Sequence, residues 1–166
     1  MKPSPNRRMA WIAILVLFLD QVTKQIVLRI IGPYDEHVVI DGFFKFVNWG
    51  NTGAAWSMFH NQNRRLAVIS AVALCGLFYW RRHFDTRTVL GQASLGLIFG
   101  GIIGNLIDRI FIHHVVDFLR FYIYRRGGEE IGFPAFNIAD SAICIGVGLL
   151  FILSWRSEAT VPAEAI

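Results

Sequence analysis

Four aspartates lie close to the ends of long uncharged stretches of this sequence, where carboxylates are unusual. They are Asp20, Asp108, Asp117 and Asp140. Ionisable side chains at the edge of a long apolar segment are costly to bury, which makes them candidates for function. Two carboxylates that meet in a partly desolvated site hold one proton between them, so that one acts as acid and the other as base. Such a pair can activate water and cleave a peptide bond without a metal.

Two of the aspartates have basic neighbours in the sequence. Lys24 lies one helical turn after Asp20 and can neutralise it, which favours a structural polar pair. Asp108 is followed directly by Arg109, which favours a structural role for this carboxylate as well. Neither aspartate is therefore the first candidate for catalysis.

Asp117 and Asp140 have no adjacent basic residue. Each lies near the end of a different apolar segment, and carboxylates at the same ends of neighbouring helices can meet. We therefore interpret them as a candidate acid and base. For Asp140 a second interpretation stays open, because an aspartate near the start of a helix often caps that helix.

Other kinds of catalytic chemistry find less support. His113 and His114 precede Asp117, but adjacent histidines point in different directions along a helix and no HExxH motif is present. The GxSxG motif of serine hydrolases is also missing. The two cysteines, Cys75 and Cys144, lie far apart in apolar segments, which excludes a CxxC redox pair and a disulfide framework. We expect no metal and no cofactor.

The composition indicates that lipid surrounds most of the chain. Of the 166 residues, 54% are hydrophobic and 17% are charged, a balance that excludes disorder and an ordinary soluble core. The net charge of +4 comes from basic residues clustered around apolar segments, which favours lipid headgroups over nucleic acid as partners. The sequence thus predicts a single all-α membrane domain over residues 1–166. Four transmembrane helices are expected at about residues 9–31, 64–80, 88–108 and 138–155.

The basic residues also predict how the spans are oriented. Arg81, Arg82 and Arg87 lie in the short link between the second and third spans, where the positive-inside rule has most force. This places the link and both termini in the cytoplasm. Residues 32–63 and 109–137, together with the candidate acids, then lie on the extracytoplasmic side.

Three local patterns complete the expected architecture. Alternating apolar residues over 38–49 predict a short β-hairpin. Aromatic residues over 118–124, followed by a glycine-containing turn, are typical of an interfacial belt. In the third span Gly96, Gly100 and Gly104 recur every four residues, which predicts a face that a neighbouring helix approaches closely.

Five motifs follow one another along the four predicted spans. They are DQVTK at 20–24, NTGAAWS at 51–57, GNLIDR at 104–109, HVVDF at 114–118 and FPAFNIADS at 133–141. Together these motifs resemble the boxes of bacterial lipoprotein signal peptidase, also called signal peptidase II. The resemblance covers all four predicted spans, and Trp56 stands where that family usually has phenylalanine.

The resemblance implies a multi-pass enzyme of the bacterial cytoplasmic (inner) membrane. Such an enzyme is an aspartyl endopeptidase that removes the signal peptide from prolipoproteins whose cysteine carries a diacylglyceryl group. It also implies a β-cradle from the hairpin, an interfacial helix after Asn51, and binding of cyclic peptide inhibitors of the globomycin type. By the same resemblance Asp117 and Asp140 match the catalytic pair. Substrate-site positions are matched by Asn51, Gly53, Asn105, Arg109 and Asn137.

Two other functions remain as alternatives. A small proton-coupled transporter also uses acids among helices, but its carboxylate is expected near the middle of the membrane, where the second, third and fourth segments carry no charge. A noncatalytic lipid-binding or assembly subunit would use the glycine face to dock a partner helix. Loss of activity with retained binding in an Asp140 variant would separate an enzyme from such a subunit.

Overall fold

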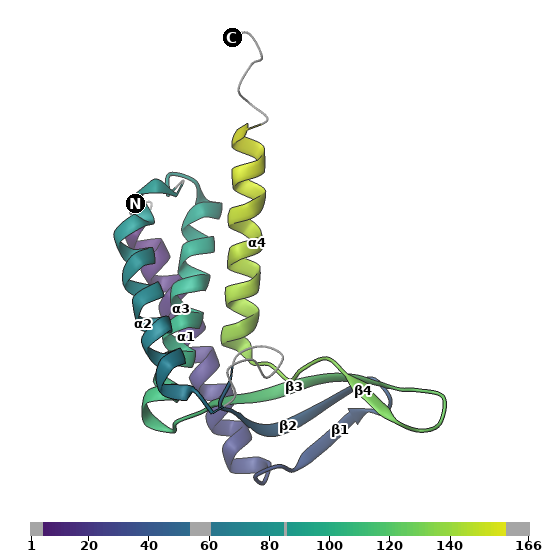
Figure 1. Cartoon of the computed structure of the whole chain (residues 1–166). Coiled ribbons are helices and arrows are strands. Elements are labelled where there is room, and N and C mark those ends of the chain that lie inside the picture. The colour runs from purple at the N-terminus through teal and green to yellow at the C-terminus, as the bar shows by residue number, and fades with distance from the viewer. Residues whose placement is uncertain (1–4, 54–60, 85, 159–166) are drawn as a thin grey trace.

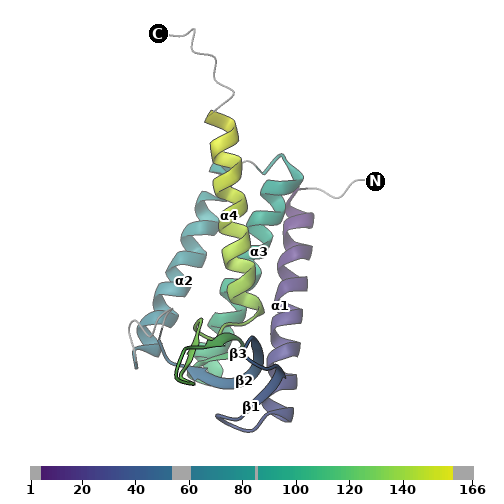
Figure 2. The same cartoon turned by 90° about the vertical axis from the view of Figure 1, so that its right-hand side faces the viewer.

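The computed structural model describes residues 5–53, 61–84 and 86–158. Four helices run side by side, and a sheet projects from one end of the bundle (Figures 1 and 2). The start of the first helix and the end of the last lie at the opposite end of the bundle. The helices are α1 (Pro5–Ile30), α2 (Asn63–Trp80), α3 (Val89–Phe111) and α4 (Ile138–Glu158), with the short helix η2 (Arg81–His83) after α2.

Three helices are long and apolar enough to cross a membrane. The candidate spans are Asn6–Ile30, Val89–Phe111 and Ile138–Trp155. Helix α2 lies beside them, but Arg64 and Arg65 occupy its first turn and leave a shorter uncharged stretch. The helical membrane architecture is therefore confirmed, whereas a fourth span stays a prediction.

Glycines let α3 approach two of its neighbours, α1 and α4, closely. A Cβ atom on Gly96 would lie 2.8 Å from the carbonyl oxygen of Met9, and one on Gly100 would lie 2.7 Å from that of Ala13, both on α1. On another side of α3, a Cβ on Gly101 would lie 2.5 Å from the carbonyl oxygen of Ala139 on α4. The predicted close approach at the glycine face is confirmed, and small residues allow it on two sides of one helix.

The sheet contains more strands than the sequence analysis predicted. The hairpin is confirmed as β1 (Glu36–Ile40) and β2 (Phe44–Asn51), but β3 (Val115–Tyr124) and β4 (Glu130–Gly132) extend it to the antiparallel order β1-β2-β3-β4. Residues 118–124, predicted as an interfacial aromatic belt, form part of β3, and the belt itself stays a prediction. β-Branched and aromatic residues fit a pleated surface, and here they pair with β2.

Strand pairing brings distant polar residues to the junction of sheet and bundle. Asn51 pairs with Val115 and Trp49 pairs with Asp117, after a register shift between Phe46 and Trp49. The segment that leads into α4 also bonds to β3, because the amides of residues 118 and 119 both donate to the carbonyl of Phe136. The end of β2 and the start of α4 therefore lie on either side of Asp117.

A buried apolar cluster fixes this junction. Val27 of α1 packs with Val116 and Phe118 of β3, and Ile138 of α4 lies against them. All three central residues are buried. Burial of such side chains provides the main driving force that holds the sheet at this angle to the helices. The expected interfacial helix after Asn51 falls at residues 54–60, which lie outside the described residues.

Candidate active site

Asp117 lies on β3 between two asparagine amides. Asn51 donates from Nδ2 to Oδ2 of Asp117 at 2.9 Å, and Asn137 donates from Nδ2 to Oδ1 at 2.8 Å. Only 3% of Asp117 is exposed. Each carboxylate oxygen thus has a neutral donor, which holds the plane of the group while leaving further lone pairs for a proton or water.

Asp140 lies in the first turn of α4 and makes a reciprocal cap with Asn137. The Asn137 amide N–H donates to Oδ2 of Asp140 at 3.2 Å, and the Asp140 amide N–H donates to Oδ1 of Asn137 at 2.9 Å. This is the geometry of a capping box. The capping interpretation of Asp140 is therefore confirmed, yet it uses only one carboxylate oxygen.

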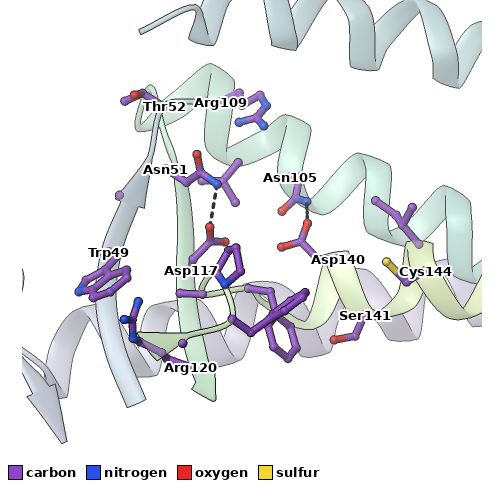
Figure 3. A pocket seen from close by; sticks show the side chains of 18 residues that line it. Trp49, Asn51, Thr52, Asn105, Arg109, Asp117, Arg120, Asp140, Ser141 and Cys144 are labelled. Carbon is purple, nitrogen blue, oxygen red and sulfur yellow. Dashed lines mark hydrogen bonds between the residues drawn. The ribbon is translucent and has the colours of Figure 1, made fainter. Parts of the chain in front are cut away.

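The other oxygen of Asp140 faces α3. Asn105 donates from Nδ2 to Oδ1 of Asp140 at 2.7 Å. Asn137 also joins the two aspartates. Its side chain donates to the carboxylate of Asp117 and accepts from the backbone amide of Asp140, and its own backbone amide donates to the Asp140 carboxylate. Figure 3 shows both carboxylates at the same cavity, one approached by Asn51 and the other by Asn105. The fold therefore brings together the two aspartates that had no basic neighbour in the sequence.

Burial and charge raise the pKa of Asp117 from 3.8 to about 7. The largest cause is desolvation, and the nearby charge of Asp140 adds to it. The hydrogen bonds from Asn51 and Asn137 act in the opposite direction. A carboxyl group with a pKa near neutrality can hold a proton at rest and release it during a reaction.

A buried ion cluster lies behind the carboxylates. Lys24 contacts Asp20 and Asp108, with Nζ to Oδ2 distances of 2.8 Å in both cases. Lys24 is only 1% exposed, and its Nζ also donates to Oδ1 of Asn105 at 3.0 Å. Asp108 therefore forms its ion pair with Lys24 of α1 and not with Arg109, its neighbour in the sequence.

This cluster joins four elements, α1, α3, α4 and β3. Asp20 accepts from the backbone amide of Ala139 at 2.9 Å, which adds a bond to the start of α4. Asp108 accepts from the backbone amide of Val116 in β3 at 3.3 Å. The charged side chains of α1 and α3 thus hold the strand and the helix that carry Asp117 and Asp140. Because Lys24 donates to the oxygen of the Asn105 amide, the amide nitrogen is left to face Asp140.

A cavity of about 760 Å³ opens in front of the two carboxylates. Its wall is largely apolar, with Phe133, Pro134 and Phe136 from the segment before α4. Polar groups converge on it from β2, β3, α3 and α4 (Figure 3). A concave apolar site with few polar groups is typical of an enzyme that binds an apolar or extended substrate.

Comparison with known proteins assigns the family. The model of signal peptidase (SPase) II matches residues 12–156. The chain belongs to the signal peptidase II family. It is 38% identical to the lipoprotein signal peptidase of Syntrophotalea carbinolica over 94% of this chain and 96% of that protein. It is 42% identical to that of Bacillus pumilus over 85% and 88% of the two chains.

The fold agrees with this assignment. A solved bacterial membrane enzyme superposes with a TM-score of 0.81 at 31% identity, covering 95% of this chain and 93% of its own. A second such enzyme gives a TM-score of 0.71 at 34% identity, covering 87% and 90%. Signal peptidase II is a family of membrane proteases, so this chain is a protease with membrane-spanning helices.

Of the substrate-site residues matched by the resemblance, Asn51, Asn105 and Arg109 line the cavity, whereas Gly53 and Asn137 do not. Asn51 accepts at Oδ1 from the amide of Gly53 at 2.9 Å, which shapes the turn after β2. Arg109 donates from Nη2 to the carbonyl of Gly53 at 3.0 Å. Among the described residues, the buried Nε and Nη1 of Arg109 have no hydrogen-bond partner, and Arg109 lines the cavity. Its guanidinium therefore has donors available to a bound molecule.

Arg120 is a charged residue of the cavity wall that the sequence motifs did not single out. Arg120 lines the cavity and donates from Nε and Nη2 to Oε1 of Glu130 at 3.1 and 2.9 Å. Its guanidinium lies 4.3 Å from the ring centre of Trp49. Lys45 also donates to Glu130, at 2.7 Å, and this bond is the main reason that the pKa of Glu130 is lowered. Assignment of residues 115–124 as a strand would have provided the signal.

The histidines that precede Asp117 lie in the turn after α3. His113 has a positive φ of 62°, and the ring of His114 packs where a side chain on Gly50 would lie. Within the part of the chain that the structure describes, no group of three potential metal ligands is found.

Proposed function

We propose that this protein is an aspartyl endopeptidase that cleaves the signal peptide from diacylglyceryl-modified prolipoproteins, on the N-terminal side of the lipidated cysteine. One observation carries the proposal. Asp117, which is buried, and Asp140, which is partly buried, face one cavity, and Asn137 bonds to both of them. Family membership supports the substrate class, because the relatives are lipoprotein signal peptidases.

The proposed reaction uses one proton shared by the two carboxyl groups. The ionised group accepts a proton from water as the water oxygen attacks the carbonyl carbon of the scissile bond. The neutral group donates its proton to the carbonyl oxygen, which gives a neutral tetrahedral intermediate. Collapse of the intermediate breaks the C–N bond. The leaving nitrogen takes a proton from the carboxyl group that accepted it from water, and one hydroxyl group of the intermediate returns its proton to the ionised carboxylate, so that the pair again holds one proton. The pKa of about 7 at Asp117 fits a group that holds this proton at neutral pH.

The residues around the pair have different proposed tasks. The side-chain amides of Asn51, Asn105 and Asn137 bond to the two aspartates, so we assign all three residues to positioning of the acids. Asn51 and Asn105 also line the cavity. Arg109 has donors left for substrate, and we assign it to the carbonyl groups of an extended peptide. Asp20 and Lys24 form the structural polar pair that supports the site. The proposal requires no metal or cofactor.

The membrane placement is part of the same proposal. Four helices would cross the bacterial inner membrane, with α2 completed by arginines that snorkel to the headgroups. Arg81, Arg82 and Arg87 follow α2, at the end of the bundle opposite the sheet, and by the positive-inside rule that end would lie in the cytoplasm. The sheet and cavity would then face the extracytoplasmic side. Cyclic peptides of the globomycin type would compete for the cavity with substrate.

The decisive experiment is cleavage of a diacylglyceryl-modified prolipoprotein by the purified chain, followed as a mobility shift on a gel. Asp117→Asn and Asp140→Asn should each abolish cleavage while retaining substrate in a crosslinking assay. Asp41→Asn is the matched control, because Asp41 lies in the β1–β2 turn and bonds only to tyrosines among the described residues. Near-normal turnover in either site variant would refute the dyad. Inactivation by a chelator, reversed by zinc, would favour the histidines instead.

A further inference from the structure

A second cavity lies between α2 and α3, at the end of the bundle opposite the active site. It has a volume of about 790 Å³ and forms a groove on the outer surface of the bundle. Phe99 and Ile103 of α3 lie at its base, and Leu74, Cys75 and Phe78 of α2 form its side. Phe78 and Phe99 meet edge to face, with ring centres 6.5 Å apart. The base and side are apolar over the full depth of the groove.

The mouth of the groove is basic. Arg81, Arg82 and His83 of η2 line it, and the described lining residues include no carboxylate. The guanidinium of Arg81 is held 3.9 Å from the ring centre of Phe78 and donates to the Phe78 carbonyl, which fixes one cation over the apolar side. Arg82 is exposed. From 81 to 87 the sequence has three arginines against one aspartate, so the mouth has a net positive charge.

The depth of the groove suits a chain that descends from the membrane surface. Leu74 lies eight residues before Arg82, which corresponds to about 12 Å along a helix at 1.5 Å per residue. Tyr79 and Trp80 lie between them, are largely exposed and contact each other, as aromatic residues do at the headgroup level. In the membrane placement proposed above, on which this inference rests, cationic side chains lie at the surface of the leaflet and apolar side chains lie beneath them.

We propose that this groove binds one anionic phospholipid of the leaflet opposite the active site. Its phosphate would contact Arg81 and Arg82, and one acyl chain would lie along Phe78, Phe99 and Ile103. Basic pockets between membrane helices are suited to anionic headgroups. The surroundings of the acyl chain are apolar both in the bilayer and in the groove. The hydrophobic effect therefore gives the acyl chain little preference for the groove. The headgroup charge decides which lipid is retained.

Headgroup selectivity provides the first test. The purified full chain is reconstituted with phosphatidylglycerol or phosphatidylcholine that have identical acyl chains, and retained lipid is measured by native mass spectrometry. Phosphatidylglycerol should be retained preferentially, and Arg82→Gln should reduce its affinity about fivefold. Arg126→Gln is the matched control, because Arg126 belongs to an exposed basic pair at the other end of the bundle. Equal retention of the two lipids, or an equal loss in both variants, would overturn the proposal.

A second variant tests the acyl chain position. Cys75→Trp adds bulk to an exposed position that lines the groove, and Val72→Trp adds the same bulk to an exposed position on α2 that does not line it. Only Cys75→Trp should reduce retention. A lipid with a photoreactive acyl chain should label peptides that contain residues 74–78 or 99–103. Labelling spread evenly over the lipid-facing helices would mean ordinary boundary lipid and would refute the site.

Discussion

Asn137 and Asp140 bond to each other through two reciprocal hydrogen bonds across the first turn of α4, at 3.2 and 2.9 Å. The same Asn137 side chain reaches Asp117 on β3 at 2.8 Å. The residue that caps α4 is therefore also the residue that joins the two proposed catalytic aspartates. The capping and catalytic interpretations of Asp140 do not exclude each other, because its two oxygens have different partners.

Replacement of Asn137 should affect stability and activity together. Asn137→Ala removes a cap, at a cost of about 1 kcal/mol, and also frees Asp117, so cleavage should fall at least about 100-fold. Asn48→Ala is the matched control, because this buried asparagine donates to the Ile31 carbonyl at 2.8 Å away from the carboxylates. The control should lose stability but keep its kcat. Unchanged kcat in Asn137→Ala would contradict the role assigned to the link.

The raised pKa of Asp117 predicts that stability falls as the pH rises. The folded state holds a proton up to about pH 7, whereas an ordinary aspartate releases it near 3.8. The stability linked to this proton is fully present below the lower value and is lost through the upper one, by up to about 4 kcal/mol. Tm measured from about pH 4 to pH 8 should fall in the wild type relative to Asp117→Asn. A constant difference between the two curves would argue against the shift.

Two buried lysines should differ in their importance for stability. Lys24→Met leaves Asp20 and Asp108 unpaired where neither is exposed, which should cost about 3–5 kcal/mol. Lys45→Met removes a lysine that is equally hidden, but its partners Glu36 and Glu130 reach solvent, so about 1 kcal/mol or less is expected. Thermal unfolding in detergent compares the two. Equal losses would show that the buried cluster is not specially dependent on Lys24.

The glycine face of α3 should not tolerate even a methyl group. Gly100→Ala would place Cβ 2.7 Å from both the Ala13 carbonyl oxygen and the Cβ of Val16, so we expect a loss of about 1–3 kcal/mol. Gly148→Ala on α4 meets nothing within 4 Å and should be neutral or slightly stabilising, since alanine favours helix. Thermal stability measured side by side decides between them. A similar change in both would mean that α1 and α3 separate easily.

Substrate selection should depend on the lipid anchor. The two carboxylates lie where the sheet meets the helical bundle, so the scissile bond must be held at that depth. An acyl chain contributes about 0.8 kcal/mol per buried methylene to such anchoring. A prolipoprotein with an unmodified cysteine should therefore show a much lower kcat/KM than its diacylglyceryl form in the same bilayer. Comparable values would refute this role of the lipid and leave the aspartyl mechanism standing.

The sequence by itself determined the features that depend on local pattern. The long uncharged stretches predicted the membrane helices, and the spacing of Gly96, Gly100 and Gly104 predicted a close helix contact. The absence of basic neighbours beside Asp117 and Asp140 marked the two carboxylates that the fold brings to one cavity. Each of these signals comes from composition or periodicity within one segment, which a sequence records directly.

The tertiary structure decided everything that requires two distant segments to meet. Asp108 has Arg109 beside it in sequence, yet its partner is Lys24, because packing of α1 on α3 brings that lysine to 2.8 Å. Strand β3 takes its place in the sheet by pairing with β2, a non-local contact that no local pattern encodes. The orientation of the Asn105 amide depends on donors from other elements. Such contacts arise only when the whole core closes, since their energy is gained between segments rather than within them.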